Sequence, residues 1–239
     1  MAEPSVVMVS ASFHPYVGGA EKQALELSVA LRQRGVRVRV LTRGRPGLSG
    51  PDEVRGVPVE RLACFGPGFI NAVTFMLSLG RWLWVHAAEY SVVHVHLAGS
   101  PALPAALAGR FLKKRVVIKL GGGRGIGELA ASSGSWSGRL KLWLLARLRP
   151  QFVAVTRDLA EECVQYLGPV PLRVLPNGVD VSRYKPAAPE AKAALRRGLG
   201  WPAGLGFLYV GRLSPEKQLR GFLQAWTEQA QAAAAPSFL

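Results

Sequence analysis

Residues 5–31, SVVMVSASFHPYVGGAEKQALELSVAL, contain two hydrophobic patterns joined by a pair of glycines. The continuous apolar run from Ser5 to Ser10 is typical of a buried strand. After Gly18 and Gly19, apolar residues recur at steps of four, three and four, which is typical of a helix with one buried face. The stretch therefore predicts a strand that gives way to a helix at the glycine pair.

The alternation of strand and helix continues along the chain. Short apolar strands that alternate with helices predict an α/β fold, a doubly wound parallel sheet with helices on both faces. Such sheets bind ligands beyond the carboxyl ends of their strands, which is where the glycine pair lies. Further strands are expected at 36–43, 56–65, 92–97, 115–120, 152–156 and 172–179, and helices at 101–112 and 157–167.

The glycine pair has two interpretations. At the start of a helix, free backbone N–H groups and the positive end of the helix dipole attract anions. Glycine also lets a phosphate or a sugar approach the backbone closely. The alternative is a plain tight turn, which Gly18 and Gly19 would favour if nothing else in the chain supported a ligand site.

Composition limits the classes of protein to consider. Apolar residues make up 49% of the 239 residues and charged residues 19%, which is typical of a globular chain. Thirty Lys and Arg against fifteen Asp and Glu give a net charge of +15. This charge suits a nucleic acid, an anionic membrane surface or a phosphate-bearing small molecule, and it also suits a solvated basic surface with no partner.

The two cysteines, Cys64 and Cys163, form no CxxC pair and no metal-ligand spacing. We therefore expect neither a disulfide framework nor a zinc site, and a reducing compartment. The first ten residues lack the basic segment and the cleavage site of a signal peptide. The expected location is cytoplasmic.

Two apolar helices raise the question of a membrane. Residues 69–88 form the most apolar window, but Arg81 and His86 interrupt it, and a membrane span needs about 20 nearly uninterrupted apolar residues. The window predicts a helix that is largely buried or that lies at an interface. In residues 139–150 the basic residues spread around the helix axis, which favours a packed helix over an interfacial one.

Residues 181–200 are rich in Pro, Ala and charged residues, which predicts a linker. We therefore expect an amino-terminal domain over 1–180 and the start of a second domain of the same kind over 201–239. With one strand and one helix, this second part is too short to bury a core of its own. Its expected elements are a strand at 206–213 and a helix at 214–231 with Pro215 in its first turn.

Four short motifs follow one another along the chain: GGAE at 18–21, HVH at 94–96, LPNGVD at 175–180 and VGRLSPEKQL at 210–219. In this order and at these separations they resemble family 4 glycosyltransferases, over nearly the whole chain. The resemblance implies a retaining, nucleotide-sugar-dependent enzyme of the GT-B fold, with two facing doubly wound domains. The segment KLGGGRGIGEL, 119–129, is similar to members that build bacterial polysaccharides, and we expect it to form a loop on the acceptor side.

A nucleotide-sugar donor releases a nucleoside diphosphate, so catalysis needs positive charge and hydrogen-bond donors at the leaving phosphate. By the resemblance, Arg212 and Lys217 bind this diphosphate. The same resemblance places Gly18 and Gly19 in a glycine loop that faces the donor phosphates and the acceptor. We expect no metal cofactor, because the sequence shows no metal-ligand cluster and the two cations can neutralise the diphosphate.

His94 and His96 lie two residues apart on a predicted strand and therefore point to one face. A lone HxH pair is usually structural or incidental. The resemblance gives the second histidine an active-site role near the reacting sugar carbon, so His96 is the candidate catalytic residue and His94 a packing residue. The candidates for acceptor or hinge contacts are Glu21, Lys119, Asn177 and Asp180.

One departure from the family affects the expected activity. The family places a glutamate pair late in its second domain to hold the sugar and the ribose of the donor, and this chain ends before that region. We therefore expect a glycosyltransferase fragment that is inactive alone. In its complete form it would transfer a sugar from a nucleotide-sugar donor to a saccharide or lipid-linked acceptor with retention of configuration.

Two other classes remain as alternatives. The chain could be a non-catalytic GT-B-like subunit that needs a partner chain to complete its site. A nucleic-acid-binding protein ranks last, because the sequence contains no nucleic-acid-binding module and no run of aromatic residues interleaved with basic ones. Peripheral contact with the anionic inner face of a membrane is a further expectation, based on the net charge and on the apolar window at 69–88.

Overall fold

The computed structural model describes residues 4–16, 18–48, 50–123, 125, 127–201, 206–211 and 213–232. The chain divides into two compact units, residues 1–180 and 181–239.

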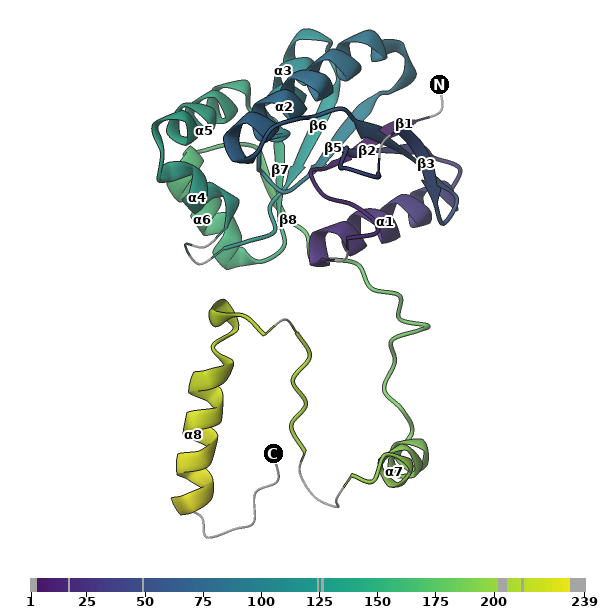
Figure 1. The fold of residues 1–239 in the computed structure, drawn as a ribbon, viewed down its shortest axis with the longest axis vertical. Coiled ribbons are helices and arrows are strands. Elements are labelled where there is room, and N and C mark those ends of the chain that lie inside the picture. Colours follow the sequence, from purple (N-terminus) through teal and green to yellow (C-terminus); the bar gives the residue numbers. More distant parts are fainter. Residues whose placement is uncertain are drawn as a thin grey trace. The chain divides into compact units, whose positions relative to one another are not determined.

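An eight-stranded sheet forms the centre of the first unit, in the order β3-β4-β2-β1-β5-β6-β7-β8 (Figure 1). Every pair of neighbouring strands is parallel except β3 and β4. This arrangement confirms the predicted α/β fold class. The strands are β1 Ser5–Ser10, β2 Arg37–Arg43, β3 Gly50–Val54, β4 Val57–Leu62, β5 Val92–His96, β6 Arg115–Lys119, β7 Gln151–Ala154 and β8 Leu172–Val174.

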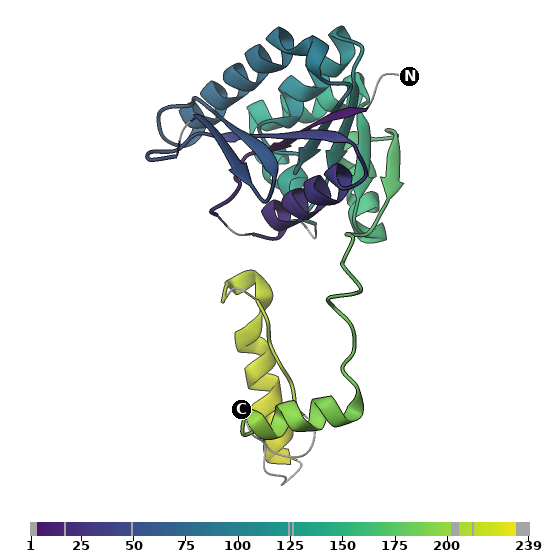
Figure 2. The ribbon, with the colours of Figure 1, turned by 90° about the vertical axis from the view of Figure 1, so that its right-hand side faces the viewer.

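Helices cover both faces of this sheet (Figures 1 and 2). On one face, α1 joins a core cluster that includes Met8, Val40 and Val59. The other helices of the first unit join a larger cluster, which contains alternate residues of the strands such as Val9 and Val95. The helices are α1 Gly19–Arg32, α2 Gly68–Val85, α3 Ala102–Phe111, α4 Glu128–Ser133, α5 Trp136–Leu148 and α6 Arg157–Leu167, with a 3-10 turn η1 at Ala87–Glu89.

The apolar run that opens the chain is explained by these two clusters. Val7 and Val9 pack in the larger cluster, and Met8 between them packs in the cluster with α1. Successive side chains of a strand point to opposite faces, so a central strand covered on both faces must be apolar throughout. This is why residues 5–10 show no polar alternation.

The edge of the sheet differs from the prediction. A single strand was expected over 56–65, whereas the structure has a hairpin of β3 and β4. Arg55 and Gly56 join the two strands with φ angles of 53° and 77°. Two successive positive φ values make the tight two-residue turn that matches the twist of a hairpin, and glycine favours the second position.

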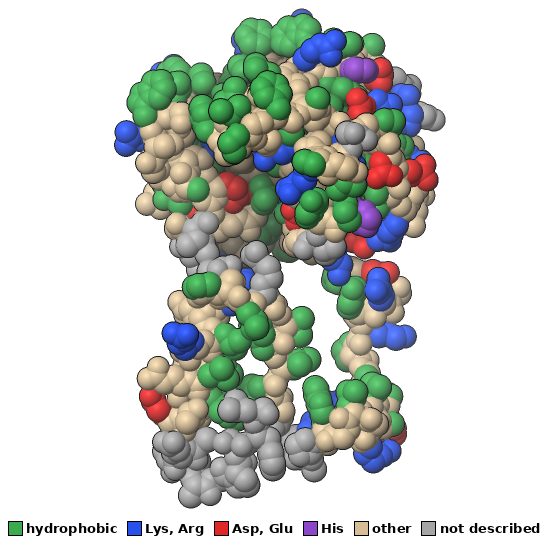
Figure 3. Space-filling view, in the orientation of Figure 1, with side chains coloured by type: hydrophobic (Ala, Val, Ile, Leu, Met, Phe, Trp, Pro, Cys, Tyr) green, Lys and Arg blue, Asp and Glu red, His purple; other side chains and the backbone are tan. Residues whose placement is uncertain are grey.

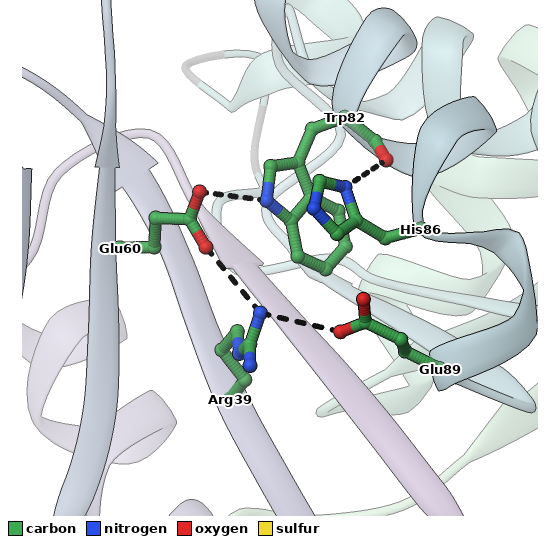
Figure 4. A network of polar contacts seen from close by, with 5 residues as sticks. All are labelled: Arg39, Glu60, Trp82, His86 and Glu89. Carbon is green, nitrogen blue, oxygen red and sulfur yellow. Dashed lines mark hydrogen bonds and ion pairs between the residues drawn. The ribbon is translucent and has the colours of Figure 1, made fainter.

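A polar network fastens α2 to the sheet (Figure 4). Glu60 on β4 accepts a hydrogen bond of 2.7 Å from Nε1 of Trp82 and pairs with Arg39 on β2 at 3.5 Å. Arg39 also pairs with Glu89 in η1, and the ring of His86 stacks on Trp82 with 4.3 Å between centroids. The network therefore links β2 and β4 to the end of α2 and to η1.

The second unit holds α7 Pro189–Gly198, a 3-10 turn η2 Pro215–Lys217 and α8 Leu219–Ala232. The expected linker thus contains a helix, which Pro189 begins in its first turn and which alanines and charged residues continue. The expected helix over 214–231 is divided, because Gln218 adopts a left-handed conformation with φ 51° between η2 and α8.

The prediction of a strand over 206–213 is wrong for the described residues of that range, which form no strand. A strand needs a neighbour to pair its backbone groups, and one apolar segment alone cannot supply it. Phe207 packs instead against α8, with its ring 4.7 Å from that of Trp226. Val210 is left 85% exposed. None of the helices in the described ranges of the chain has the length and apolar character needed to cross a membrane.

Candidate functional site

Four polar side chains form a row across the carboxyl ends of four adjacent strands. The strand register pairs Ser10 with Thr42 on one side and with His96 on the other, and it pairs His96 with Lys119. Residues paired directly in neighbouring strands project to the same face of the sheet. Because Met8 packs in the cluster of α1 and lies two residues before Ser10, the row is on the α1 side.

His96 is the most buried ionisable residue of this row, with 2% of its surface exposed. Its ring stacks on that of His94, with centroids 4.5 Å apart and planes at 14°. Within the described residues, Nε2 of each ring is buried and has no hydrogen-bond partner. Burial lowers the pKa of His94 to about 4, and burial together with the charges of His94 and Lys119 lowers the pKa of His96 well below its ordinary value.

Both imidazoles are therefore neutral at neutral pH. A neutral imidazole carries one N–H donor and one acceptor nitrogen, so it can bond a sugar hydroxyl in either direction. A buried polar atom without a partner costs about 1–3 kcal/mol, and a ligand hydroxyl that reached Nε2 of His96 would remove this cost. The half-buried Lys119, whose pKa burial lowers, adds a cation next to this position.

The residues Ser10 and Thr42 were missed by the sequence analysis. Both are almost fully buried, and the hydroxyl of Thr42 has no hydrogen-bond partner within the described residues. The hydroxyl of Ser10 donates to the carbonyl of Ser12 at 2.6 Å. Their signal in the sequence is weak, because only the pairing register of the strands shows that Ser10 stands beside His96 and Thr42 beside Ser10.

Glu128 was also missed, and it joins two loops at the same edge of the sheet. Its Oε1 accepts hydrogen bonds from the backbone N–H groups of Ala98 at 3.3 Å and Gly121 at 3.1 Å, and its Oε2 accepts from Gly122 at 3.0 Å. The Nζ atom of Lys141 donates to the carbonyl of Ala98 at 3.0 Å. One carboxylate thus holds the loop after β5 against the loop after β6.

The glycine-rich segment that follows β6 is closely packed around this carboxylate. A Cβ atom on Gly122 would lie 2.8 Å from the Cα of Gly127 and 3.0 Å from Oε2 of Glu128. Three backbone N–H groups that the segment could offer to an external anion are bound by the chain itself: those of Gly121 and Gly122 donate to Glu128, and that of Gly125 donates to Glu162. The signal that could have identified Glu128 is an acidic residue in the first turn of a helix directly after a glycine-rich run.

The glycine pair at the start of α1 has a clear steric role. Gly18 is the N-cap residue in an extended conformation, and Gly19 is the first helical residue. The carboxylate of Glu21 folds back over Gly18, where a Cβ atom would collide with it. A phosphate or an acceptor can approach the backbone of Gly18 only if this flexible side chain moves aside.

Two arginines hold the loop that leads to the glycine pair. Arg45 donates to the hydroxyl of Ser12 at 3.5 Å, and its guanidinium lies 4.2 Å from the ring centroid of Tyr16. Arg61, which is almost fully buried, donates to the carbonyl of His14 at 3.0 Å. Residues 12–16 of the segment that follows β1 are thus held by β4 and by the turn after β2.

Asn177 and Asp180 lie exposed in the segment that follows β8. Gln23 of α1 donates to the carbonyl of Gly178 at 3.4 Å, which ties this segment to the helix behind the glycine pair. The segment therefore reaches α1, although the side chains of Asn177 and Asp180 do not join the polar row.

The predicted diphosphate-binding residues belong to the other unit. Lys217 is exposed at the end of η2 in the second unit, and Arg212 lies outside the described residues. Of the predicted site residues, the structure brings His96 and Lys119 side by side. No group of three or more His, Cys, Asp or Glu that could hold a metal ion occurs in the described part of the chain.

Comparison with known proteins identifies the family. A sequence profile of Glycosyltransferase Family 4 matches residues 17–183, well over half of the chain. No curated protein matches the chain.

Among solved structures, sucrose-phosphate synthase from Thermosynechococcus elongatus is similar with a TM-score of 0.65 and 17% identity, over 95% of this chain and 60% of that one. WaaG, a glycosyltransferase involved in lipopolysaccharide biosynthesis, is similar with a TM-score of 0.53 and 16% identity, over 82% of this chain and 51% of that one. Identities this low show a shared fold, and this chain spans at most 60% of either structure. On the profile match, the chain belongs to glycosyltransferase family 4.

Proposed function

We propose that this chain supplies the acceptor-side domain of a glycosyltransferase. The enzyme transfers a sugar from a nucleotide-sugar donor to a saccharide or lipid-linked acceptor, with retention of configuration. The observation that carries the proposal is the buried Nε2 of His96, which has no hydrogen-bond partner among the described residues and is flanked by Ser10 and Lys119 at the carboxyl edge of a parallel sheet. Family membership supports glycosyl transfer as the reaction class.

In this reaction the bond between the anomeric carbon and the diphosphate oxygen breaks, a bond from that carbon to the oxygen of an acceptor hydroxyl forms, and the proton of the hydroxyl passes to the departing diphosphate. The neutral ring of His96 orients the sugar by a hydrogen bond to a hydroxyl near the reacting carbon. Lys119 supplies positive charge beside it. Arg212 and Lys217 neutralise the departing diphosphate, a role that rests on the resemblance of their motif to the family.

The nature of the acceptor has separate support. The fold is shared with WaaG, a glycosyltransferase involved in lipopolysaccharide biosynthesis, and this supports a bacterial polysaccharide or lipid-linked acceptor here. We place the protein in the cytoplasm, in peripheral contact with the inner membrane face. The net charge of +15 supports contact with an anionic surface.

We further propose that the complete enzyme needs no divalent cation, because the two cations of the 210–219 motif can take the place of a metal at the diphosphate. Transfer should then continue in EDTA. A complete loss of transfer in EDTA that manganese restores would show that this part of the proposal is wrong.

Binding of the acceptor tests the proposed site in this chain. Saturation-transfer NMR with a panel of oligosaccharides should show binding to the wild type and a strong reduction in His96→Ala and Lys119→Ala. His14→Ala, a change at an exposed histidine of the same unit, is the matched control and should bind as the wild type does. Equal binding by wild type and His96→Ala would contradict the assignment.

Turnover tests the alternative, a non-catalytic subunit. We expect the 239-residue chain alone to transfer no sugar, since the described part of its second unit forms no sheet to hold a donor. The donor-side domain of a family 4 enzyme, fused after Asp180, should restore transfer. If that transfer is lost in His96→Ala, this chain carries the catalytic residue, and if it is unchanged, the role of His96 is wrong. A fusion that transfers no sugar would favour the subunit interpretation.

A further inference from the structure

Two helices carry matching rows of apolar and basic side chains on their outer surfaces. Both α2 and α5 bury one side against the sheet, through residues such as Phe75 and Leu145. Residues spaced at four, seven and eleven positions share one side of a helix. The outer row of α2 is Ile70, Leu77, Arg81 and Trp84, and the outer row of α5 is Trp136, Leu140, Trp143 and Arg147, all of them exposed.

These rows belong to one layer, because α3 packs against both α2 and α5. We call the outer surface of α2, α3 and α5 the α2–α5 face. Phe111 at the end of α3 pairs with Trp84, with 6.2 Å between ring centroids, and Arg147 lies 5.2 Å from the ring centroid of Trp143. Figure 3 shows hydrophobic side chains gathered over the region where Figure 1 draws these helices.

The charge of this layer has one sign. The sequences of α2, α3 and α5 contain no Asp or Glu, whereas the basic residues Arg81, Arg110, Arg139 and Arg147 are exposed on them. The helices elsewhere in the first unit do carry acids, such as Glu21 and Glu26 in α1. The absence of acids is therefore a property of this layer and not of the whole chain.

The basic character continues past the end of α3. Lys113 and Arg115 are exposed directly after Phe111, and they line a shallow hollow together with Ser91 and Lys114. The hollow lies at the amino ends of β5 and β6, beside the Trp84 end of α2. Cations next to exposed aromatic rings suit a surface that offers phosphate groups above an apolar layer.

We propose that the α2–α5 face docks on an anionic phospholipid bilayer. Exposed Trp and Phe rings enter the interfacial region of such a bilayer, and the arginines reach the phosphates beside them. A second copy of this chain is a poor occupant, because it would bring another basic, acid-free face against this one. The inference names the surface that makes the membrane contact given under the proposed function. Its biological purpose rests on that proposed function.

The docked orientation also suits the acceptor. In a parallel sheet, the helix that follows a strand begins at the carboxyl edge, so the start of α2 lies at the edge that carries the polar row. Phe65 and Phe69 are exposed at this end of α2. A bilayer in contact with them would present a lipid-linked saccharide at the carboxyl edge that carries His96, although the side chain of His96 projects to the α1 face, opposite to α2.

Vesicle co-sedimentation tests the inference with the chain as it is. The probes are phosphatidylcholine vesicles with and without phosphatidylglycerol, free of any saccharide lipid. We expect binding to the anionic vesicles, with a steep loss in high salt. The double variant Trp84→Gln/Trp143→Gln should bind at least about tenfold more weakly, since each exposed ring loses its transfer into the interface. Arg81→Gln/Arg147→Gln should weaken binding and flatten its salt dependence.

Trp201→Gln is the matched control. Trp201 is 46% exposed in the second unit, against 54% for Trp84 and for Trp143, so its loss should leave vesicle binding unchanged. Circular dichroism checks that each variant is folded. Binding that ignores anionic lipid, or that the double tryptophan variant retains, would overturn the inference.

Two other results have defined meanings. If sedimentation velocity shows that the wild type self-associates and the double variant is monomeric, with no vesicle binding, the face is an interface between copies and the proposal fails. Because the vesicles carry no acceptor, failed docking leaves the oligosaccharide binding of His96 unaffected. Failed oligosaccharide binding likewise leaves docking intact, so the two proposals are tested separately.

Discussion

The imidazole rings of His94 and His96 stack on the same side of β5, with 4.5 Å between their centroids. Two protonated rings at this distance would repel each other, and burial already disfavours the charge on each. The fold therefore favours the neutral form of both rings. Within the described residues, Nε2 of each ring has no hydrogen-bond partner, so two polar atoms at the end of the strand can still bond a ligand.

The pH dependence of folding should report this pair. The pKa of each ring is lowered in the folded state, whereas an unfolded histidine titrates near 6.5. Below that pH the unfolded chain binds more protons, so stability is complete above about pH 6.5 and falls as the pH drops. For His94 the loss continues toward about pH 4, with a slope of at most about 1.4 kcal/mol per pH unit.

Urea unfolding at a series of pH values between these limits measures the slope. His94→Gln should reduce it, because the variant has one histidine fewer to protonate on unfolding. A slope that is the same in His94→Gln and in the wild type would show that the pair does not control the acid sensitivity of the fold.

Glu128 should hold two loops together in solution. Glu128→Gln removes the charge and replaces one acceptor oxygen by an N–H donor that faces other donors, so at least one backbone N–H group loses its bond. We expect a loss of about 1–3 kcal/mol in unfolding free energy. Hydrogen exchange at the amides of Ala98, Gly121 and Gly122 should accelerate. Glu161→Gln, on the exposed side of α6, is the control.

The result has a clear negative outcome. If the three amides exchange at wild-type rates in Glu128→Gln, the carboxylate does not organise the loops. In that case the glycine-rich segment would keep its conformation by backbone packing between Gly122 and Gly127 alone.

The bond between Glu60 and Trp82 should stabilise the attachment of α2. Trp82 is 5% exposed, so Glu60→Ala leaves its indole N–H buried without an acceptor, at a cost of about 1–3 kcal/mol. Trp82→Phe removes the donor, and the double variant should therefore lose less than the sum of the two single changes. Glu89→Ala breaks an exposed ion pair with Arg39 and should cost about 0–1 kcal/mol.

Chemical denaturation of the wild type, Glu60→Ala, Trp82→Phe and the double variant provides the double-mutant cycle, and Glu89→Ala is measured beside it. A coupling energy near zero between Glu60 and Trp82 would mean that the hydrogen bond contributes nothing beyond the packing of the ring. A large loss in Glu89→Ala would mean instead that the ion pair at the rim dominates the network.

Local pattern was enough to predict the buried strands. The run at 92–97 and the run at 115–120 became β5 and β6 because each is apolar, short and bounded by helix signals. The cap of α6 was also predictable, since Thr156 accepts a hydrogen bond from the backbone of Leu159 as its residue type suggests. The glycine pair likewise marks the first residues of α1.

Features that depend on neighbours were not predictable. Pro51, Asp52 and Glu53 disfavour strands, and they form β3 only because β4 supplies an antiparallel partner. The converse holds for 206–211, whose apolar pattern forms no strand without a neighbour. At the candidate site, His96 and Lys119 were found by residue type and motif, whereas Ser10 and Thr42 depend on a register that a single sequence does not reveal.

The boundary between the two units should be the first place that a protease cuts. The residues from 181 to 188 form no helix or strand and are exposed, whereas α7 begins at Pro189. Exposed segments outside helices and strands are the preferred sites of limited proteolysis. We expect early cleavage within 181–200 and a resistant fragment that ends near Asp180, which mass spectrometry can identify.

The released fragment should fold alone, because both core clusters lie within residues 1–180. Its thermal transition should match the main transition of the whole chain within a few degrees, since a shift of that size corresponds to about 1 kcal/mol. The second unit should be degraded, because large apolar side chains such as Leu208 and Val210 remain exposed in it. A protease-resistant product that contains α8, or a fragment over 1–180 that fails to fold, would contradict the division into an independent domain and a dependent segment.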